Sequence, residues 1–223
     1  MSMSDSYTGS VEVGGDKDVR RLPGLTIAKL AVGPMNNNAY LLRCTQTDEG
    51  LLIDAANEAD RLRELVEFDG PPVSAILTTH RHGDHWQALA ETVEFAGAAV
   101  YAGDADADEL PVAVDERLAH GETITVGDLS LQIIALRGHT AGSVAVLYPD
   151  PEGVPHLFTG DSLFPGGPGR TTSPQDFTSL MDDLEVRVFA ELPDETWFYP
   201  GHGDDSTLGA ERPHLAEWRA RGW

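Results

Sequence analysis

Apolar residues along the chain fall into short runs separated by polar turns. Helical spacing of apolar positions occurs in four stretches, at about 57–68, 86–95, 173–188 and 213–221. The remaining apolar runs predict strands at 25–32, 39–44, 51–54, 73–77, 98–101, 123–126, 129–136, 143–148, 156–159 and 196–199. Each half therefore gives strands followed by helices. This order predicts an α/β fold, an αββα four-layer sandwich of two mixed β-sheets flanked by helices.

The first 23 residues differ from the rest of the chain. They are polar and rich in Ser, Gly and Asp, so residues 1–23 are predicted to form a disordered or loosely attached tail, with residues 24–223 as a single domain. They lack the apolar core of a signal peptide, and no later run is long enough to span a bilayer. With one cysteine, Cys44, no intramolecular disulfide can form. We therefore expect a cytoplasmic protein.

Charge narrows the possible partners. Acidic residues outnumber basic ones 37 to 15, which gives a formal net charge of -22. Such a surface repels nucleic acid and anionic membranes. The expected partner is a small-molecule substrate, with no nucleic acid and no membrane.

The strongest chemical signal is the run His80-x-His82-x-Asp84-His85, directly after the apolar strand 73–77. Three imidazoles and a carboxylate within six residues are costly to bring together without a cation, because buried charged rings repel and neutral ones need partners. Neutral imidazole and carboxylate are typical ligands of zinc, iron or manganese. The run therefore predicts a metal site in the loop between a strand and a helix.

Three further segments place a possible ligand beside a glycine at the end of an apolar strand. Their ligand residues are His139, Asp161 and His202. With the first run, they account for five of the eight histidines. The other three have no such context and are predicted to be surface or structural residues: His120, His156 and His214.

This ordered series resembles the metallo-β-lactamase superfamily over about residues 25–203, with Asp54 at the end of Leu52-Ile53-Asp54 as a fifth motif. The resemblance implies two metal ions, zinc first, with iron or manganese also compatible. The first ion would be held by His80, His82 and His139, the second by Asp84, His85 and His202, with Asp161 bridging both. Asp54 would orient a ligand histidine from behind.

Within the superfamily the chain looks most like the glyoxalase II-like (hydroxyacylglutathione hydrolase-like) branch. The likeness rests on Thr79 before the first run, on Asn37-Asn38-Ala39-Tyr40, on Gly160-Asp161-Ser162-Leu163-Phe164 and on Gly169-Arg170-Thr171. The chain departs from that branch in having Trp86-Gln87 after the first run. Only 21 residues follow His202, where glyoxalase II enzymes carry a helical extension that grips glutathione. The likeness therefore does not extend to that specificity.

The resemblance implies a metal-dependent hydrolase. A hydroxide activated by two metal ions would attack the carbonyl of a thioester or another ester or lactone. Asp84 and Asp161 would orient the nucleophile and its proton as catalytic residues. Arg170 would either contact an anionic group of the substrate or fix its own loop.

Two alternatives stay open. Persulfide dioxygenases share the same motifs but use one iron, which His80, His139 and Asp161 would hold here. A metal-binding protein that has lost catalysis is the alternative from another class.

Overall fold

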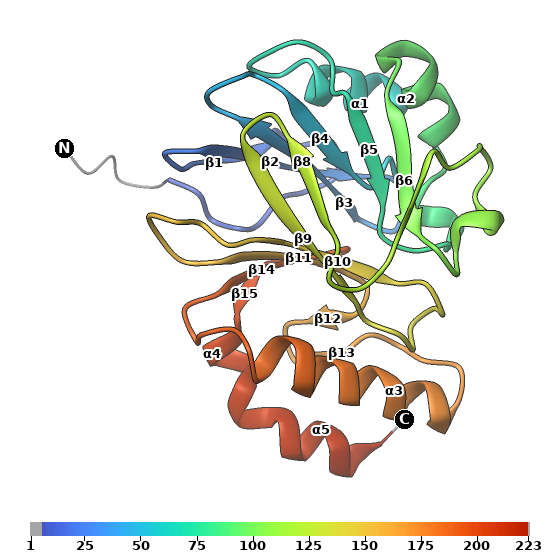
Figure 1. Ribbon diagram of the computed structural model, residues 1–223, viewed down its shortest axis with the longest axis vertical. Helices are drawn as coiled ribbons and strands as arrows, with labels where there is room; N and C mark the ends of the chain where they lie inside the picture. Colours follow the sequence, from blue (N-terminus) through green and yellow to red (C-terminus); the bar gives the residue numbers. More distant parts are fainter. Residues whose placement is uncertain (1–5, 223) are drawn as a thin grey trace.

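In the computed structural model, which describes residues 6–222, two β-sheets pack face to face and helices cover their outer faces (Figure 1). The first sheet has seven strands in sequence order, antiparallel in its first part and parallel from β4 to β7. Its strands are β1 (Asp18–Arg21), β2 (Leu25–Val32), β3 (Asn37–Cys44), β4 (Gly50–Ile53), β5 (Ala75–Thr78), β6 (Ala99–Gly103) and β7 (Glu116–Leu118).

The second sheet has six strands in the order β15-β14-β11-β10-β9-β8. It is also mixed, because β11 and β14 run parallel while the other neighbours are antiparallel. Its strands are β8 (Thr123–Val126), β9 (Leu129–Ala135), β10 (Val144–Tyr148), β11 (His156–Gly160), β14 (Trp197–Pro200) and β15 (Ser206–Thr207), and a separate hairpin joins β12 (Leu163–Phe164) to β13 (Gly167–Pro168). The predicted αββα architecture is confirmed.

The helices form the two outer layers (Figure 1). On the first sheet lie α1 (Ala59–Val66) and α2 (Leu89–Ala96), and on the second α3 (Pro174–Leu184), α4 (Leu208–Glu211) and α5 (Leu215–Arg221). The N-cap of α3 is Ser173, whose hydroxyl accepts a hydrogen bond from the Asp176 amide at 3.1 Å. A π-helical turn, Glu185–Phe189, continues α3. No helix within residues 6–222 is long and apolar enough to cross a membrane.

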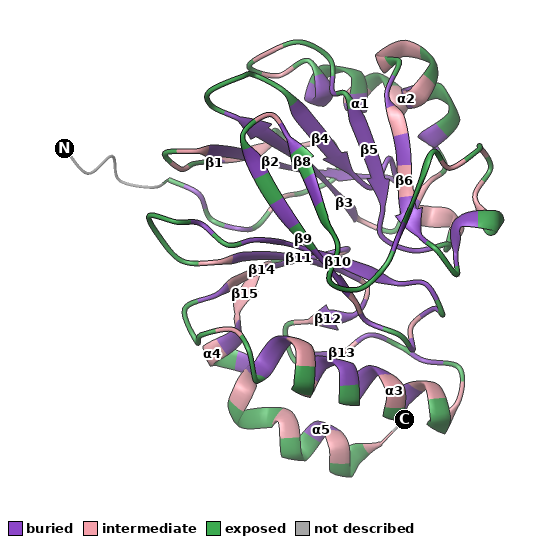
Figure 2. Cartoon of the chain, viewed as in Figure 1, coloured by how far each residue is buried: buried purple, intermediate pink, exposed green. Residues whose placement is uncertain are grey.

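Three apolar layers follow from this arrangement, and burial is continuous along the central strands (Figure 2). Every residue of β2 and β3 is buried, because these strands pack on the second sheet with one face and on the α1–α2 layer with the other. In β9, exposed and buried residues alternate over its first four positions, typical of a strand with one solvated face.

The N-terminal segment differs from the expectation of a loose tail. Residues 1–5 lie outside the described residues, but from residue 6 onward the chain packs on the domain. Tyr7 is 8% exposed and joins the core between the sheets, while 18–21 form β1 at the edge of the first sheet. The segment was expected to be loose because it is polar. Its polar groups are satisfied by specific partners, as described below.

Two helix starts also differ from the sequence-based expectation. Glu58, not Asn57, is the N-cap of α1; the Asn57 side chain bonds the Glu58 amide at 2.8 Å and Gln87 Oε1 at 2.5 Å. The helix expected at 86–95 begins at Leu89, after a short 3₁₀ turn over Gly83–His85. This turn carries Asp84 and His85 into the site described next.

Candidate metal centre

The seven residues predicted as metal ligands come together at one end of the two sheets. The loop after β5 carries His80, His82 and the 3₁₀ turn, and the loops after β9, β11 and β14 supply the other three ligands. A hydrogen bond from the Val144 amide to the Thr79 carbonyl, 3.0 Å long, ties β10 to the loop after β5. Residues far apart in sequence therefore meet because strand ends from both sheets converge.

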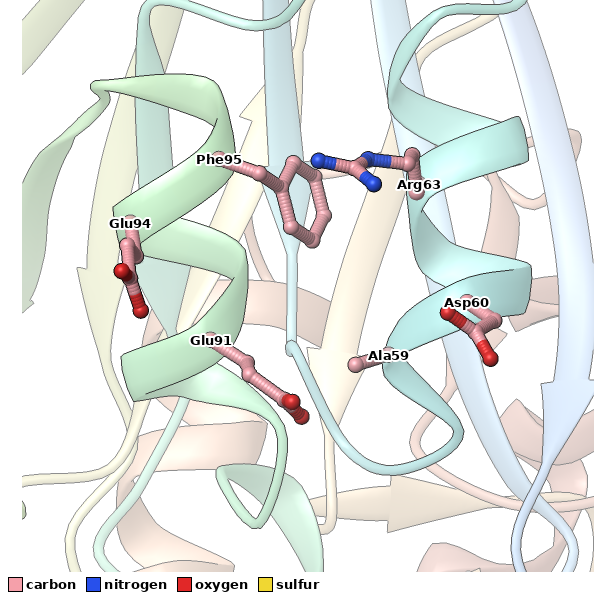
Figure 3. A pocket seen from close by; sticks show the side chains of 6 residues that line it. All are labelled: Ala59, Asp60, Arg63, Glu91, Glu94 and Phe95. Atoms are coloured by element: carbon pink, nitrogen blue, oxygen red, sulfur yellow. The ribbon is translucent and has the colours of Figure 1, made fainter.

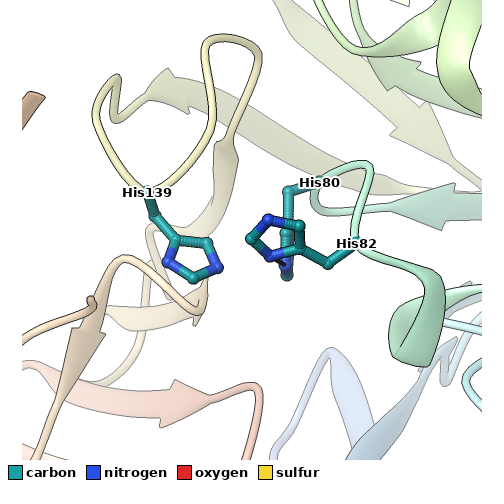
Figure 4. A group of neighbouring side chains, drawn as sticks. All are labelled: His80, His82 and His139. Carbon is teal, nitrogen blue, oxygen red and sulfur yellow. Dashed lines mark hydrogen bonds between the residues drawn. The ribbon is translucent and has the colours of Figure 1, made fainter. Parts of the chain in front are cut away.

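The first group consists of His80, His82 and His139, whose rings lie close together and nearly perpendicular to one another (Figure 4). His80 Nε2 lies 3.1 Å from His82 Nδ1. The ring centres of His80 and His139 are 4.7 Å apart. His80 is buried and His82 is exposed, so this group opens to solvent on the His82 side.

The second group consists of Asp84, His85 and His202. The Nε2 atoms of His85 and His202 are 3.2 Å apart. Asp84 Oδ2 lies 3.5 Å from His85 Nε2 and 3.4 Å from His202 Nε2. Asn37 Nδ2 donates to the same Asp84 oxygen at 2.8 Å, so this carboxylate is held in place.

Asp161 lies between the two groups. Its Oδ1 is 3.3 Å from His85 Nε2, and its Oδ2 is 3.4 Å from His202 Nε2 and 3.6 Å from His139 Nε2. This close approach needs a glycine next to it, because a Cβ atom on Gly201 would lie 2.1 Å from Asp161 Oδ1. One carboxylate thus reaches histidines of both groups.

Hydrogen bonds on the outer side of the rings decide which nitrogen faces inward. His139 Nδ1 is 2.7 Å from the Arg170 carbonyl, and His202 Nδ1 is 2.9 Å from the Met35 carbonyl. A carbonyl only accepts, so both Nδ1 atoms must donate. The Nε2 lone pairs of His139 and His202 therefore point into the site, as metal ligands require.

Asp54 fixes two further rings, one in each group. Its Oδ2 lies 2.8 Å from His85 Nδ1 and accepts the Thr79 hydroxyl at 2.8 Å. Because that hydroxyl donates its hydrogen to Asp54, it can only accept from His80 Nδ1, 3.1 Å away. Nε2 of both His80 and His85 then faces inward. The expected role of Asp54 behind a ligand histidine agrees with this geometry.

The pKa values of the histidines are shifted in opposite directions. Burial, and then the neighbouring His85, lowers the pKa of His80 well below its usual value; burial likewise lowers the pKa of His139. Burial opposes the charge on His85 too, but the carboxylates of Asp54 and Asp161 raise its pKa to about 10. The negative potential that holds a proton on His85 equally favours a divalent cation, which would displace that proton.

The nitrogen and oxygen atoms of the two groups are suited to binding metal ions. Within residues 6–222, His139 Nε2 is buried without a hydrogen-bond partner. Two pairs of ring nitrogens, one in each group, also lie 3.1 and 3.2 Å apart. A cation on each group would satisfy these nitrogens, and imidazole with carboxylate suits zinc, iron or manganese.

A buried ion pair supports the His202 loop, and the sequence analysis did not identify it. Lys29 Nζ donates to Asp205 Oδ1 at 2.6 Å, to the Gly203 carbonyl at 2.7 Å and to the Gly9 carbonyl at 2.7 Å, with both charged side chains fully buried. Tyr7 donates to the other oxygen of Asp205 at 2.6 Å. The available signal was a lysine within the apolar run Leu25–Val32.

Two other carboxylates hold the loops of the first group. Asp106, 1% exposed, accepts the Arg81 amide at 3.0 Å and the Gly142 amide at 2.9 Å, so it joins the His80 and His139 loops. Asp183 on α3 accepts the Arg137 amide at 2.9 Å and its guanidinium at 2.7 Å, two residues before His139. Neither aspartate has a local motif that would have marked it in the sequence.

The remaining sequence-based expectations concern four residues. The exposed side chain of Arg170 makes no hydrogen bond or ion pair within the described residues, although its carbonyl holds His139. His120 and His214 are exposed. His156 is buried, 2% exposed, and its Nδ1 lies 2.8 Å from the Tyr199 hydroxyl, between the sheets.

A hollow on the outer surface between α1 and α2 has no part in this chemistry (Figure 3). The Arg63 guanidinium of α1 lies over the Phe95 ring of α2, 4.8 Å from the ring centre. Asp60, Glu91 and Glu94 also line the hollow. None of these side chains belongs to the ligand groups.

Known proteins share this framework. The family model described as Metallo-beta-lactamase superfamily matches residues 32–202. A hydroxyacylglutathione hydrolase from Fuscovulum blasticum is 36% identical over 169 residues, which cover 75% of this chain and 62% of the relative. The chain therefore spans less than two thirds of the length of such relatives.

Two solved structures are similar over most of their length. ETHE1 from Myxococcus xanthus has a TM-score of 0.75 at 29% identity, covering 87% of this chain and 84% of that one. TTHA1623, solved in a di-iron-bound form, has a TM-score of 0.65 at 32% identity, covering 82% of this chain and 96% of that one.

Proposed function

Because the chain belongs to the metallo-β-lactamase superfamily, we propose that it is a hydrolase that uses two divalent metal ions to cleave a thioester or another ester or lactone. The observation that carries the proposal is Asp161, a carboxylate within 3.6 Å of histidines from both ligand groups. Two ions would be held by the groups already described, with Asp161 between them. The likeness to hydroxyacylglutathione hydrolases and to a di-iron protein supports the same function.

The chain's own residues have separate tasks in this mechanism. The ions, when bound, would supply an activated hydroxide and a Lewis acid for the carbonyl oxygen. Asp84, held by Asn37 at 2.8 Å, would orient the nucleophile and pass its proton to the thiol or alcohol that leaves as the ester bond breaks. Asp161 would hold the two groups at a fixed distance from each other. Asp54 would keep His80 and His85 in the tautomer whose Nε2 can bind a metal.

Zinc is the first choice of metal in this proposal, since imidazole and carboxylate are among its usual ligands in proteins. Iron and manganese accept the same ligands. A cytoplasmic location and a small-molecule substrate belong to the same proposal.

The likeness to ETHE1 supports one second candidate function. In an oxygen-dependent persulfide reaction, one iron would be held by His80, His139 and Asp161, two histidines and one carboxylate. His82 and the second group would then not bind metal.

Metal analysis of protein purified without added metal or chelator tests the proposal first. We expect about two zinc, iron or manganese ions per chain, followed by hydrolysis in a panel of thioesters and lactones. One iron per chain, with oxygen consumption on persulfides, would support the second candidate instead. Full metal content with no turnover of thioesters, lactones, lactams or persulfides would indicate a metal-binding protein without catalysis.

A further inference from the structure

The N-terminal segment lies against the loop after β14, which carries His202 and which we call the His202 loop. The Gly9 carbonyl accepts the Asp205 amide at 3.1 Å. The Tyr7 hydroxyl donates to Asp205 Oδ2 at 2.6 Å. One bond to the backbone and one to the side chain therefore join the segment to a residue that follows the ligand closely in the same loop.

Lys29 extends this contact to the residue next to the ligand. Its ammonium donates to the carbonyls of Gly9 and Gly203, both at 2.7 Å, and to Asp205 Oδ1 at 2.6 Å. An ammonium has three hydrogens, so these acceptors satisfy it fully while its side chain is completely buried. Without the Gly9 carbonyl, a buried charged donor would lose a partner, which is costly, and Lys29 would hold Gly203 less firmly.

The segment is itself anchored to both sheets. Asp18 of β1 accepts the amides of Thr8 and Gly9 at 2.8 and 3.0 Å, and the Thr8 hydroxyl at 2.8 Å. The ring of Tyr7 is buried and packs against Trp197 of β14, with 6.2 Å between the ring centres. The segment is therefore held in one arrangement beside the strand from which the His202 loop leaves.

The approach of the segment to the loop is close enough to require glycine. Gly9 has a φ of 76°, and a Cβ atom on it would lie 3.0 Å from the Cβ of Asp205. Gly14 has nearly the same φ, 80°, but a Cβ atom there would meet nothing within 4 Å. The two glycines share a backbone conformation and differ in whether they contact the His202 loop.

The first ligand group is held by other elements, since Asp106 joins the loops of His80 and His139. The groups that hold a metal ligand from behind are typically worth about 10- to 100-fold in metal affinity. We propose that residues 7–9 position His202, so that the N-terminal segment sets the affinity of the second ion and leaves that of the first unchanged. These residues act through the loop rather than as ligands. This inference rests on the two-metal centre of the proposed function.

The two glycines give a matched test. Gly9→Ala pushes against Asp205, whereas Gly14→Ala has the same backbone strain without a neighbour. We expect the dissociation constant of the second ion to rise about 10-fold in Gly9→Ala, with the first ion unchanged and with both unchanged in Gly14→Ala. Chelator competition on the zinc-loaded protein measures each ion, and the ion lost in His202→Ala is the second. Equal weakening of both ions in Gly9→Ala, or none, would overturn the inference.

A milder variant removes one hydrogen bond and keeps the packing. Tyr7→Phe loses only the hydroxyl that donates to Asp205, so the second ion should bind about 3- to 10-fold more weakly. Tyr101→Phe is the control, because it removes a hydroxyl from β6, on the other side of the first sheet from β1. A second ion that binds equally well in Tyr7→Phe and Tyr101→Phe would exclude a positioning role for Tyr7.

Hydrogen exchange of the metal-free protein separates this inference from the proposed function. The Asp205 amide donates to Gly9, so exchange in residues 198–207 reports the contact directly. We expect faster exchange there in Gly9→Ala and Tyr7→Phe than in Gly14→Ala, with no change in residues 78–86. If this holds but the parent binds one ion, the two-metal hydrolase fails and the positioning of the loop stands. If the parent binds two ions and cleaves esters, but exchange is unchanged in both variants, the positioning fails.

Discussion

The two ligand groups of the metal centre look alike in composition but are supported in different ways. The first group, His80, His82 and His139, is open at His82, and its loops are tied by Asp106 and Asp183. The second group has a fully buried ion pair behind it, formed by Lys29 and Asp205. Burial lowers the pKa of Lys29 and raises that of Asp205, so the pair is held against a desolvation cost.

The difference shows where the protein concentrates its polar interactions. The His202 loop is bonded to the first sheet through Lys29 and Asn38, and to the N-terminal segment through Asp205 and Tyr7. The polar segment that precedes β2 is therefore part of the site's support. The His139 loop depends instead on two buried carboxylates, Asp106 in the loop after β6 and Asp183 on α3. We expect the second group to be damaged by changes at the Lys29–Asp205 pair, and the first by changes at Asp106 or Asp183.

The largest effect is expected at the one residue that both groups share. In Asp161→Ala, metal content should fall below two ions per chain, and hydrolysis should fall by about 1000-fold or more, because a bound metal supplies several kcal/mol to the transition state. Metal analysis and ester hydrolysis measure both. Asp128→Asn, an exposed aspartate outside the site, is the control. Retention of both ions and of activity in Asp161→Ala would contradict the proposed bridge.

The next largest effect is expected at the buried ion pair of Lys29 and Asp205, which supports the second group. Lys29→Met leaves Asp205 charged and without its cation, so the free energy of unfolding should fall by about 3–5 kcal/mol. Chemical denaturation measures this, and Arg21→Met, which removes an exposed ion pair with Asp69, should cost at most about 1 kcal/mol.

A second variant separates stability from positioning of the loop. Lys29→Met/Asp205→Asn removes the unpaired charge, and the new side-chain amide can still accept a hydrogen bond from Tyr7, so most of the stability should return. The Gly203 carbonyl stays without its lysine, so the affinity of the second metal should remain weakened. Full recovery of metal affinity together with stability would show that Lys29 acts on the fold alone.

A smaller effect is expected where one residue orients rings of both groups. Asp54→Asn keeps the shape of the side chain but weakens the acceptor for His85 Nδ1 and for Thr79. Metal affinity or activity should fall by about 10- to 100-fold. Chelator competition measures the affinity of each ion separately. An unchanged affinity of both ions in a folded Asp54→Asn would remove Asp54 from the mechanism.

The smallest effect depends on pH and concerns the support of the first group. Although burial opposes it, the hydrogen bond from Arg137 holds the pKa of Asp183 below its usual value. A carboxylate with a lowered folded pKa stabilises the fold above its unfolded pKa, about 3.9, and loses this contribution as pH falls through the folded pKa. Asp183→Asn should therefore cost about 1–2 kcal/mol at pH 7, with a shrinking difference from the parent below about pH 4.

Denaturation of parent and Asp183→Asn side by side checks this at each pH, since any shared loss of metal cancels in the difference. Asp182→Asn, its exposed neighbour on α3, is the control. A difference between Asp183→Asn and the parent that is as large at pH 3 as at pH 7 would contradict the assigned charge state.

The sequence by itself determined the architecture and the candidate ligands. Apolar runs with a period of two or of 3.6 are local features, and so is a histidine or aspartate beside a glycine at a strand end. The strands over Thr123–Val126 and Leu25–Val32 have the bounds that their patterns predict, because a strand with a buried face needs that pattern.

Only the tertiary structure decided how the site is supported. Lys29 and Asp205 are 176 residues apart, and Tyr7 reaches the same aspartate across 198 residues. The inward nitrogens of His139 and His202 depend on backbone carbonyls that no local pattern marks. Burial and the satisfaction of polar groups are properties of the packed chain, so a polar N-terminal segment looks loose in sequence until its partners are in place.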